Sequence, residues 1–464
     1  MRAFSLTSAI ALLAFNYVQV AFSCPGDGGN STFPAGNTTI TAWAAKQVDI
    51  SISKMFSCIN PPGTAKGFLA ASLSTSNPDY YYSWTRDSAL SFRVLVDELR
   101  SGSNSTIDGL IQDYITYSQK AQSTSTVCNC LGEPKFNPDG SSYTGPWGRP
   151  QNDGPAERAT TLIIYSNIVG TSNLKSMIYK DLDYITNVWD NQNFDLWEEV
   201  NGRHFFTYMV MRRGLLDGAE FATKNGDTDK ANSYKSVVTN IENRINSFWN
   251  SNDGFIKVTI DQNGGFNKPS GLDASVLIAA NVGSRNDGFY TPGSDKMLAT
   301  AVKIENAFAN LYAINQNKES HLGTAIGRYP EDVYNGNGSS QGNPWFICTN
   351  AFAELYYRAI KEWTDKGSVK VTSISLPFFK KFDNNAADGT TYTAGSDQFN
   401  SLVNNIALAA DQFLSTVKYH QYQNGSMSEQ YNRNTGYNQG AYDLTWSHAS
   451  TLTAINAKNG TPDL

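Results

Sequence analysis

The sequence has few of the residues on which most nucleophilic and metal-dependent enzymes depend. Its 464 residues include five cysteines and only four histidines, which are His204, His321, His420 and His448. The histidines do not cluster, and no cysteine lies at a metal-ligand spacing from one of them. We therefore expect no metal site and no cofactor, and no serine or cysteine nucleophile paired with a histidine.

Positive charge and long apolar runs are also scarce. The net charge is −6 without any run of Lys or Arg, which argues against a nucleic-acid partner. Residues 1–23 begin with one basic residue, continue with an apolar stretch and end in small residues, the pattern of a cleaved secretory signal. No later segment is long enough to span a bilayer. We expect a secreted protein with no membrane partner and with 24–464 as one domain.

The cysteines and the glycosylation sequons agree with a secretory route. Because Cys128 and Cys130 are only two residues apart, we expect each to pair with Cys24 or Cys58 rather than with each other. Cys348 lies in an apolar run and is expected to be a buried free thiol. Six sequons mark candidate N-glycosylation sites, at Asn30, Asn37, Asn104, Asn337, Asn424 and Asn459.

Apolar residues recur mainly at the helical spacing, as at Leu402, Ile406, Ala409 and Phe413. The pattern predicts roughly twelve helices, near 41–59, 86–101, 106–122, 155–169, 172–189, 202–224, 228–250, 271–282, 295–315, 345–364, 396–420 and 443–457. The best strand candidate is short and covers 254–260. Long loops rich in Gly, Asn and Pro separate several helices. An all-α helical barrel with a pocket built by loops on one side would show this organisation.

The long loops hold most of the combinations of Trp, acidic residues and Arg. Sugar recognition uses this inventory, because aromatic rings stack on the apolar faces of sugars while Asp and Arg bind hydroxyl groups. Hydrolysis of an acetal needs a protonated acid at the leaving oxygen and a second carboxylate on the opposite face. Two glutamates from loops far apart in the sequence, Glu198 and Glu429, form the natural pair.

The stretch FDLWEEVNG places Glu198 directly beside Glu199. If it begins a helix, the two side chains diverge by about 100° and cannot share one role. One would face the glycosidic bond, and its neighbour would bind substrate while disfavouring ionisation of the first. A helix N-terminus that merely favours acidic residues is the alternative. GSSQG at 338–342 matches the nucleophile-elbow pattern but follows no apolar strand, so it does not indicate that class.

In this order, the blocks WTRDS, WGRPQ, DLWEEVNG, GRYPED, NPWF, GSMSEQY and DLTWS resemble the fungal-type glucoamylases of glycoside hydrolase family 15. The resemblance covers the chain from about Tyr80 to Trp446. It implies an (α/α)6 barrel with an inner and an outer layer of helices. It also implies exo-hydrolysis of α-1,4 links, and more slowly of α-1,6 links, from the non-reducing ends of starch and malto-oligosaccharides. The product would be β-D-glucose, because the family inverts.

The same resemblance implies roles for individual residues. Glu198 corresponds to the general acid, and Glu429 corresponds to the general base that activates water. The terminal glucose would be held by Arg86, Asp87, Arg328 and the backbone carbonyl of Leu196. The other substrate-binding candidates belong to the aromatic wall or flank the first two subsites, and they are Tyr80, Trp84, Trp147, Trp197, Glu199, Tyr334, Trp345 and Trp446.

Two departures from the family pattern bear on the substrate. The loop 335–344 is longer than the family's compact version, which leaves the chain-length preference open. No separate starch-binding module is recognisable, so we expect weak action on raw granules, and we expect a monomer. Two alternatives remain: a helical-barrel glycosidase for another α-glucan or a disaccharide, and a carbohydrate-binding protein without activity. The intact pair of Glu198 and Glu429 argues against the second.

Overall fold

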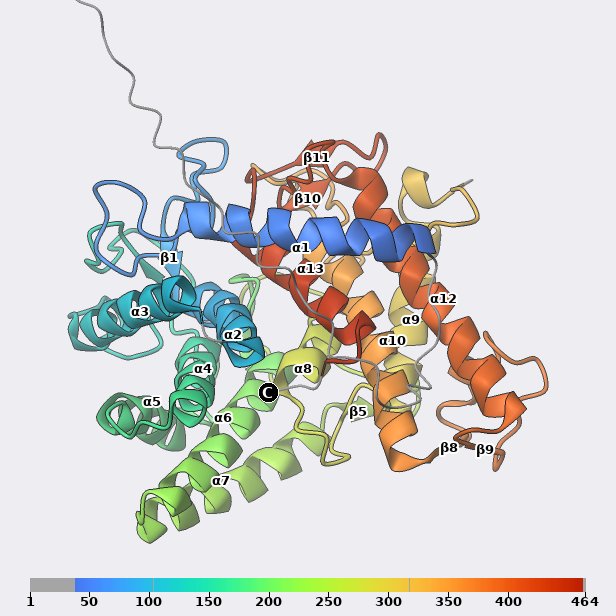
Figure 1. Cartoon of the computed structure of the whole chain (residues 1–464), viewed down its shortest axis with the longest axis horizontal. Coiled ribbons are helices and arrows are strands. Elements are labelled where there is room, and N and C mark those ends of the chain that lie inside the picture. The colour runs from blue at the N-terminus through green and yellow to red at the C-terminus, as the bar shows by residue number, and fades with distance from the viewer. Residues whose placement is uncertain (1–37, 103, 317, 462–464) are drawn as a thin grey trace, which may run out of the picture. The chain divides into compact units, whose positions relative to one another are not determined.

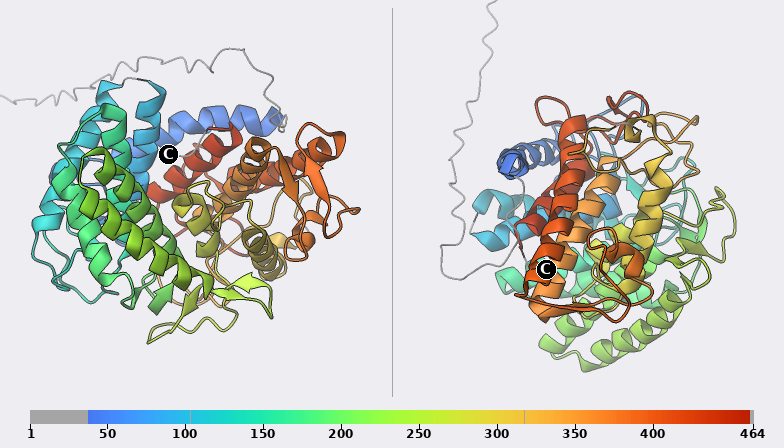
Figure 2. Two further views of the ribbon diagram at one scale, coloured as in Figure 1. Left: turned by 90° about the horizontal axis from the view of Figure 1, so that it is seen from below. Right: turned by 90° about the vertical axis from the view of Figure 1, so that its right-hand side faces the viewer.

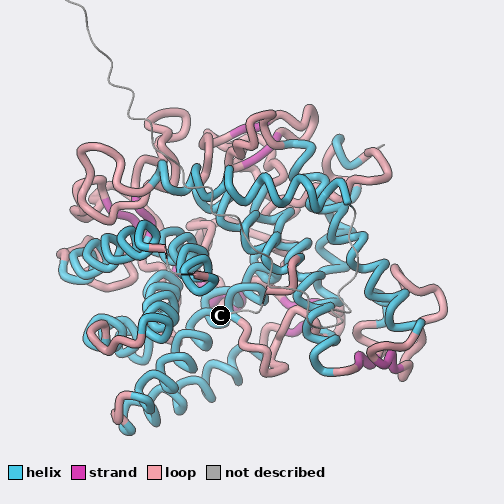
Figure 3. Tube along the Cα trace, viewed as in Figure 1, coloured by secondary structure: helices cyan, strands magenta, loops and turns pink. Residues whose placement is uncertain are grey.

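The computed structural model describes residues 38–461 except 103 and 317. Most of the described chain is helical, and the strands are short (Figure 3). Six helices pack side by side in a closed ring: α2 (Thr85–Ser101), α4 (Asp153–Val169), α6 (Phe205–Lys224), α8 (Ser275–Gly283), α10 (Phe346–Lys366) and α13 (Thr445–Lys458). Six more cover this ring from outside: α1 (Thr38–Cys58), α3 (Ser105–Ser123), α5 (Lys175–Val188), α7 (Thr228–Asn246), α9 (Asp295–Ala309) and α12 (Asp397–His420) (Figure 1).

The two layers alternate along the chain, so each outer helix is followed by an inner one. This is the (α/α)6 barrel that the sequence resemblance implied. The ring closes where α13 packs against α2, and α1 lies along α13 (Figures 1 and 2). No helix among the described residues is long and apolar enough to cross a membrane.

Burial distinguishes inner helices from outer ones. Inner helix α4 is buried at every position from Asp153 to Ser166, as expected for a helix with neighbours on all sides. Outer helix α7 buries one stripe with helical spacing, formed by Ala231, Tyr234, Val238, Ile241 and Ile245. The helical period in the sequence is therefore clearest in the outer layer, where one face meets solvent.

The connections differ strongly between the two ends of the barrel. Links from inner to outer helices can be very short, as between α4 and α5 (170–174) and between α6 and α7 (225–227). Links that lead into inner helices are long: 59–84, 124–152, 189–204, 247–274, 310–345 and 421–444. The predicted long loops are confirmed. All six lie at the N-terminal ends of the inner helices, where the helix dipoles present partial positive charge.

Small antiparallel sheets fix these loops. The strands are β1 (Ser83–Trp84), β2 (Lys135–Phe136), β3 (Asn193–Phe194), β4 (Asn201–His204), β5 (Trp249–Asn250), β6 (Phe255–Ile256), β7 (Thr259–Ile260), β8 (Ser368–Lys370), β9 (Thr391–Thr393), β10 (Gln430–Tyr431) and β11 (Asn438–Gln439). The predicted strand 254–260 is not one strand, because β6 pairs with β5 while β7 pairs with β4. The helix expected from 202 begins at Phe205, since β4 occupies its first residues. The helix expected over 295–315 ends at Ala309, and only a 3-10 turn, Ala313–Asn315, follows it. The short helix α11 (Leu376–Phe379) was not predicted.

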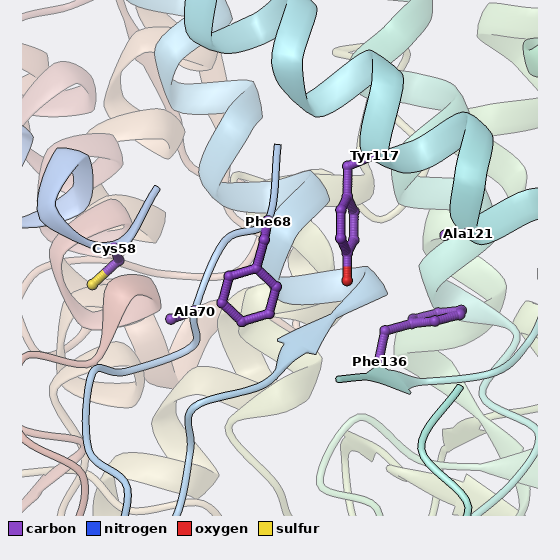
Figure 4. Packing of buried hydrophobic residues seen from close by; sticks show 6 residues of the cluster. All are labelled: Cys58, Phe68, Ala70, Tyr117, Ala121 and Phe136. Atoms are coloured by element: carbon purple, nitrogen blue, oxygen red, sulfur yellow. The ribbon is translucent and has the colours of Figure 1, made fainter. Parts of the chain in front are cut away.

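A buried apolar cluster anchors two of the long loops to the outer helix α3. Phe68 from the loop before α2 packs against Tyr117 of α3 with ring centroids 6.0 Å apart (Figure 4). Phe136 of β2 joins the same cluster, and β2 pairs with β1, which ends at Trp84. The cluster thereby sets the position of Trp84 at the start of α2.

Candidate active site

The long loops enclose one pocket of about 690 Å³ at the N-terminal ends of the inner helices. Every residue that the sequence assigned to catalysis or substrate binding lines it: Tyr80, Trp84, Arg86, Asp87, Trp147, Leu196, Trp197, Glu198, Glu199, Arg328, Tyr334, Trp345, Glu429 and Trp446. The chain thus brings together residues whose positions differ by more than 300 in the sequence.

Glu198 lies in a turn and not at the start of a helix. Its φ of 69° is in the left-handed region, which a non-glycine residue adopts only when its surroundings enforce it. The backbone N–H of Glu198 donates to the Asp195 carbonyl at 2.8 Å, which closes the turn. The helix hypothesis for this stretch was wrong, because the chain enters β4 before α6 begins. The turn, rather than a helix, separates the side chains of Glu198 and Glu199.

The carboxyl group of Glu198 is fixed by donors from two loops. The Trp84 indole N–H donates to Oε1 at 2.6 Å, and the Gln151 amide donates to the same oxygen at 3.1 Å. Burial raises the pKa of Glu198, and the charge of Arg86, whose Nη2 lies 3.9 Å from Oε1, acts in the opposite direction. A raised pKa keeps more of this carboxyl protonated, as a general acid requires.

Asp195 stabilises this turn through hydrogen bonds to its backbone. Its Oδ1 accepts from the backbone N–H groups of Glu199 at 2.8 Å and Val200 at 3.0 Å. Its Oδ2 pairs with Lys268 at 3.0 Å, and both side chains are buried. Burial alone would raise the pKa of Asp195, but Lys268 and these hydrogen bonds hold it down to about 2. Asp195 is therefore a permanently charged anchor for the turn.

Glu199 takes part in a separate charged cluster. Its Oε1 accepts from Arg328 at 2.8 Å, and its Oε2 accepts from the Tyr329 hydroxyl. Arg328 is also held by both oxygens of Asp332, at 2.7 and 2.8 Å. Burial raises the pKa of Glu199, while Arg328 opposes the rise. This cluster fixes Arg328 at the pocket wall.

Glu429 approaches the pocket from the loop between α12 and α13. It is only 1% exposed, and its Oε2 accepts from the Gln430 side chain at 3.1 Å. Gly440 provides the space for this carboxyl, because a Cβ there would lie 2.7 Å from Oε2. Burial raises the pKa of Glu429 to about 8, against the lowering effects of Tyr80 and Arg328. These two effects favour the ionised form that a general base needs, but burial outweighs them, so the net shift is towards the protonated form.

A charged group at the start of α2 lines the pocket. Arg86 contacts Asp153 at 3.1 Å, Asp87 at 3.3 Å and the Gln151 side-chain oxygen at 2.9 Å. Among the described residues, neither Arg86 Nε nor Trp345 Nε1 has a hydrogen-bond partner, although both atoms are buried.

The chain is similar to known proteins of one family. The model of the family described as "Glycosyl hydrolases family 15" matches residues 51–456. The chain belongs to this family. It is 58% identical over 451 residues to "Glucoamylase 1" of Rhizopus oryzae, a match that covers 94% of this chain and 74% of the relative.

Solved structures of the family have the same fold. A glucoamylase structure from Saccharomycopsis fibuligera matches with a TM-score of 0.85 and 33% identity, covering 94% of this chain and 98% of that one. A family 15 glucoamylase from Hypocrea jecorina matches with a TM-score of 0.83 and 35% identity, covering 91% of this chain and 73% of that one. The predicted fold and the predicted family are confirmed.

The aromatic wall of this family 15 chain consists of two groups. Trp84 packs edge-on against Trp147 with centroids 6.1 Å apart and also contacts Tyr80 at 5.5 Å. Trp197 contacts Trp345 at 5.4 Å and Trp446 at 6.5 Å, and Tyr334 contacts Trp345 at 6.2 Å. Glu198 neighbours the first group through Trp84, and Arg328 packs over the second.

One residue that lines the pocket, Lys135, was not predicted from the sequence. Its ammonium group lies over four rings, with centroids at 3.7 Å (Trp147), 4.0 Å (Tyr82), 4.2 Å (Tyr143) and 4.8 Å (Trp84). Burial lowers the pKa of Lys135 to about 8. The pairing of β2 with β1 places Lys135 opposite Trp84, and a short strand pair of this kind leaves no periodic signal in the sequence.

The disulfide prediction was wrong. Cys128 and Cys130 are bonded to each other, and Cys58 and Cys348 are buried free thiols. Asn129, which lies between Cys128 and Cys130, has a φ of 49°. This left-handed residue forms a turn in which the two cysteines can bond. The buried free thiol expected at Cys348 is confirmed.

Other predicted positions are only partly described. Asn337, Asn424 and Asn459 are exposed, and Asn104 caps α3 by accepting from the N–H groups of Thr106 and Ile107. The signal 1–23, Cys24, Asn30 and Asn37 lie outside the described residues. Among the residues that are described, no group of three or more histidine, cysteine or acidic side chains is arranged to hold a metal ion.

Proposed function

We propose that this family 15 chain is an exo-acting glucoamylase that releases β-D-glucose from the non-reducing ends of starch and malto-oligosaccharides. It would cleave α-1,4 links and, more slowly, α-1,6 links, with inversion at the anomeric carbon. The observation that carries the proposal is that Glu198 and Glu429 line one pocket, together with the ion pair of Arg86 and Asp87. The names of its glucoamylase relatives support the same activity.

In the proposed mechanism, Glu198 donates its proton to the glycosidic oxygen as the bond to the anomeric carbon breaks. Glu429 removes a proton from a water molecule, whose oxygen attacks the anomeric carbon from the opposite face. After one cycle Glu198 is ionised and Glu429 is protonated, so a proton must return through solvent before the next cycle. Trp84 and Gln151 stabilise the carboxylate that Glu198 becomes, because both donate to Oε1.

The terminal glucose would be held by Arg86, Asp87, Arg328 and the carbonyl of Leu196. Ionic groups suit this task, since charge-assisted hydrogen bonds to hydroxyls are stronger than neutral ones. Arg86 and Arg328 are held by carboxylates on neighbouring residues, so neither side chain has to be ordered when the sugar binds. A clamp that recognises a chain end accounts for exo-action.

The biological setting belongs to the same proposal. The protein would be secreted after removal of residues 1–23, and it would act as a monomer through one catalytic domain, 24–464. Its partners would be starch, maltodextrins and malto-oligosaccharides, without nucleic acid, membrane or cofactor. Comparison of culture medium and cells for the mature N-terminus tests the secretion.

A proton NMR time course with maltoheptaose tests the activity and its stereochemistry. We expect β-glucose to appear before mutarotation and no short oligosaccharides except the chain one glucose shorter. Early α-glucose would indicate retention and would refute the roles of Glu198 and Glu429. Hydrolysis of isomaltose or trehalose in preference to maltose would refute the proposed preference for α-1,4 links.

A further inference from the structure

One glycosylation sequon among the described residues lies at the catalytic pocket. Asn337 lines the pocket and is also exposed. The other described sequons differ from it: Asn424 and Asn459 are exposed but do not line the pocket, and Asn104 caps α3 with its side chain. A group attached to Asn337 would therefore stand where the substrate enters.

The exposure of the lining residues shows where the mouth of the pocket is. Asp79 and Asn337 are the exposed residues of the pocket lining, whereas Arg86, Trp345 and Glu429 are only 5%, 6% and 1% exposed. The sugar-binding residues and the proposed base thus lie below the surface, while Asp79 and Asn337 lie at the rim. A glucan whose terminal glucose contacts Arg86 leaves the pocket past this rim.

Asn337 lies at the tip of a hydrogen-bonded hairpin in the loop before α10. A bridge between Tyr334 and Ser339 joins the two sides of the hairpin. Asn335 closes the tip, because its Oδ1 accepts from the backbone N–H groups of Asn337 at 3.2 Å and Gly338 at 2.9 Å. The backbone of Asn337 is therefore fixed, and a glycan on its side chain would begin at a defined point.

Contacts with two other loops hold this hairpin at the pocket. The hydroxyl of Tyr334 lies 2.9 Å from that of Tyr80, and both residues line the pocket. The Gln439 side-chain amide donates to the Asn335 carbonyl at 2.6 Å, and Gln439 belongs to β11 in the loop that carries Glu429. The tip is thus held between the aromatic wall and the loop of the proposed base.

The sequon itself is accessible in the folded chain. It consists of Asn337, Gly338 and Ser339, and all three residues are exposed. An N-glycan is a bulky and strongly hydrated oligosaccharide, so a fold accommodates it only at a surface position. The hairpin tip meets this requirement, and the fold accepts a glycan there without rearrangement.

We propose that Asn337 carries an N-glycan that restricts the catalytic pocket to chain ends without a nearby branch. The effect on substrates rests on the proposed function, because it concerns the part of the glucan that remains outside the pocket. A glycan at the rim occupies space that a branch or a neighbouring chain would need, and this steric cost discriminates against bulky substrates. Maltose has only two glucose units and ends inside the pocket, so it does not meet the glycan.

Ser339→Ala tests the proposal, because it removes the sequon and leaves Asn337 unchanged. Mass spectrometry of the secreted parent should find Asn337 glycosylated, and the variant should lack this glycan. We expect kcat/KM for amylopectin to rise about threefold or more in the variant, a modest change on the scale of binding free energies, while kcat/KM for maltose stays the same. An unoccupied Asn337, or an unchanged ratio of the two kcat/KM values, would overturn the proposal.

Two matched variants separate the glycan at the rim from other effects. Ser339→Thr keeps the sequon and should behave like the parent. Asn459→Gln removes a sequon after the C-terminal end of α13, whereas the pocket lies at the N-terminal ends of the inner helices, so it should leave both substrates unaffected. An equal rise for amylopectin in Asn459→Gln and Ser339→Ala would overturn the proposal. Digestion of the folded parent with an endoglycosidase gives the same comparison without a substitution.

The result with maltose separates this proposal from the proposed function. Absence of maltose hydrolysis by the parent would refute the catalytic proposal. The mass spectrum would then still decide whether Asn337 is modified. Binding of maltose and amylopectin to the parent and to Ser339→Ala, followed through the fluorescence of the pocket tryptophans, would decide whether the glycan restricts entry. Equal affinities of the two proteins for amylopectin would overturn the proposal in that case.

Discussion

The Trp84 indole N–H lies 2.6 Å from Oε1 of Glu198, and the two residues are 114 positions apart in the sequence. The contact joins the aromatic wall to the proposed general acid, so a tryptophan that lines the pocket also orients the proposed proton donor. It forms because β1 and the turn 195–198 converge at one side of the barrel. The contribution of this hydrogen bond to catalysis can be measured from the reaction rate of a variant that lacks the donor.

Trp84→Phe should lower kcat by roughly ten- to a hundredfold, the effect of losing a hydrogen bond to a charged group. The donor stabilises the carboxylate, so its loss raises the pKa of Glu198 and moves the basic limb of the pH profile upward. Steady-state kinetics on maltose across pH measure both effects. A change confined to KM would show that Trp84 serves only as a stacking surface.

The two proposed catalytic residues can be distinguished with α-glucosyl fluoride, whose leaving group needs no protonation. Glu198→Gln should lower kcat on maltose by about 10²–10⁴-fold and spare most of the activity on the fluoride. Glu429→Gln should lose activity on both, because water must be activated in either case. The opposite pattern would exchange the two roles.

The helices and loops could be predicted from the sequence because their signals are local, whereas their arrangement as an (α/α)6 barrel was implied by the family resemblance. Each helix carries its own apolar period, and loops are recognised by Gly, Asn and Pro, so twelve helices were found within a few residues. The pocket was predicted from motifs in the long loops and at the starts of inner helices, such as WTRDS, which runs from Trp84 into the first turn of α2. Both kinds of signal are contained in short stretches of chain.

What the sequence did not show depends on contacts between distant segments. Lys135 becomes a pocket residue only through the pairing of β1 with β2. The left-handed backbone of Glu198 results from its closure against Asp195 and from Lys268, which is about seventy positions away. Likewise, the spacing of Cys128 and Cys130 does not by itself reveal the turn at Asn129, which allows the two cysteines to bond.

The pH profile of kcat/KM should be bell-shaped. The productive form has its proton on Glu198 and none on Glu429, so it exists where the pair holds one proton in total. Burial raises the pKa of Glu429, whose protonation sets the acidic limb, and the pKa of Glu198, whose ionisation sets the basic limb. Both limbs should therefore lie at higher pH than those of free carboxyl groups. At lower pH the pair gains a second proton and loses its base. The residual activity of Glu429→Gln should lack the acidic limb. Its basic limb should lie at lower pH than in the parent, because the negative charge that raises the pKa of Glu198 is gone.

Asp195→Asn should destabilise the fold by about 3 kcal/mol near neutral pH, because it leaves the buried Lys268 with one partner fewer. The pKa of Asp195 is depressed to about 2 in the fold, so its contribution is complete above the unfolded value of about 4 and disappears as pH falls towards 2. Thermal unfolding at both ends of this range measures the difference. Asp365→Asn, in an exposed pair with Lys361, should cost less than about 1 kcal/mol.

Gly440→Ala should reduce kcat more than it changes KM. The new Cβ would lie 2.7 Å from Oε2 of Glu429 and would displace the proposed base, which takes no part in holding the terminal glucose. The residue also has a φ of 78°, where any side chain is strained, so backbone strain must be separated from the clash. Gly389→Ala provides this control, since Gly389 has a φ of 87° but no atom within 4 Å of the added Cβ. Comparable loss of stability in both variants, with loss of kcat only in Gly440→Ala, is the expected result; equal kcat values would show that the space beside Glu429 is not required.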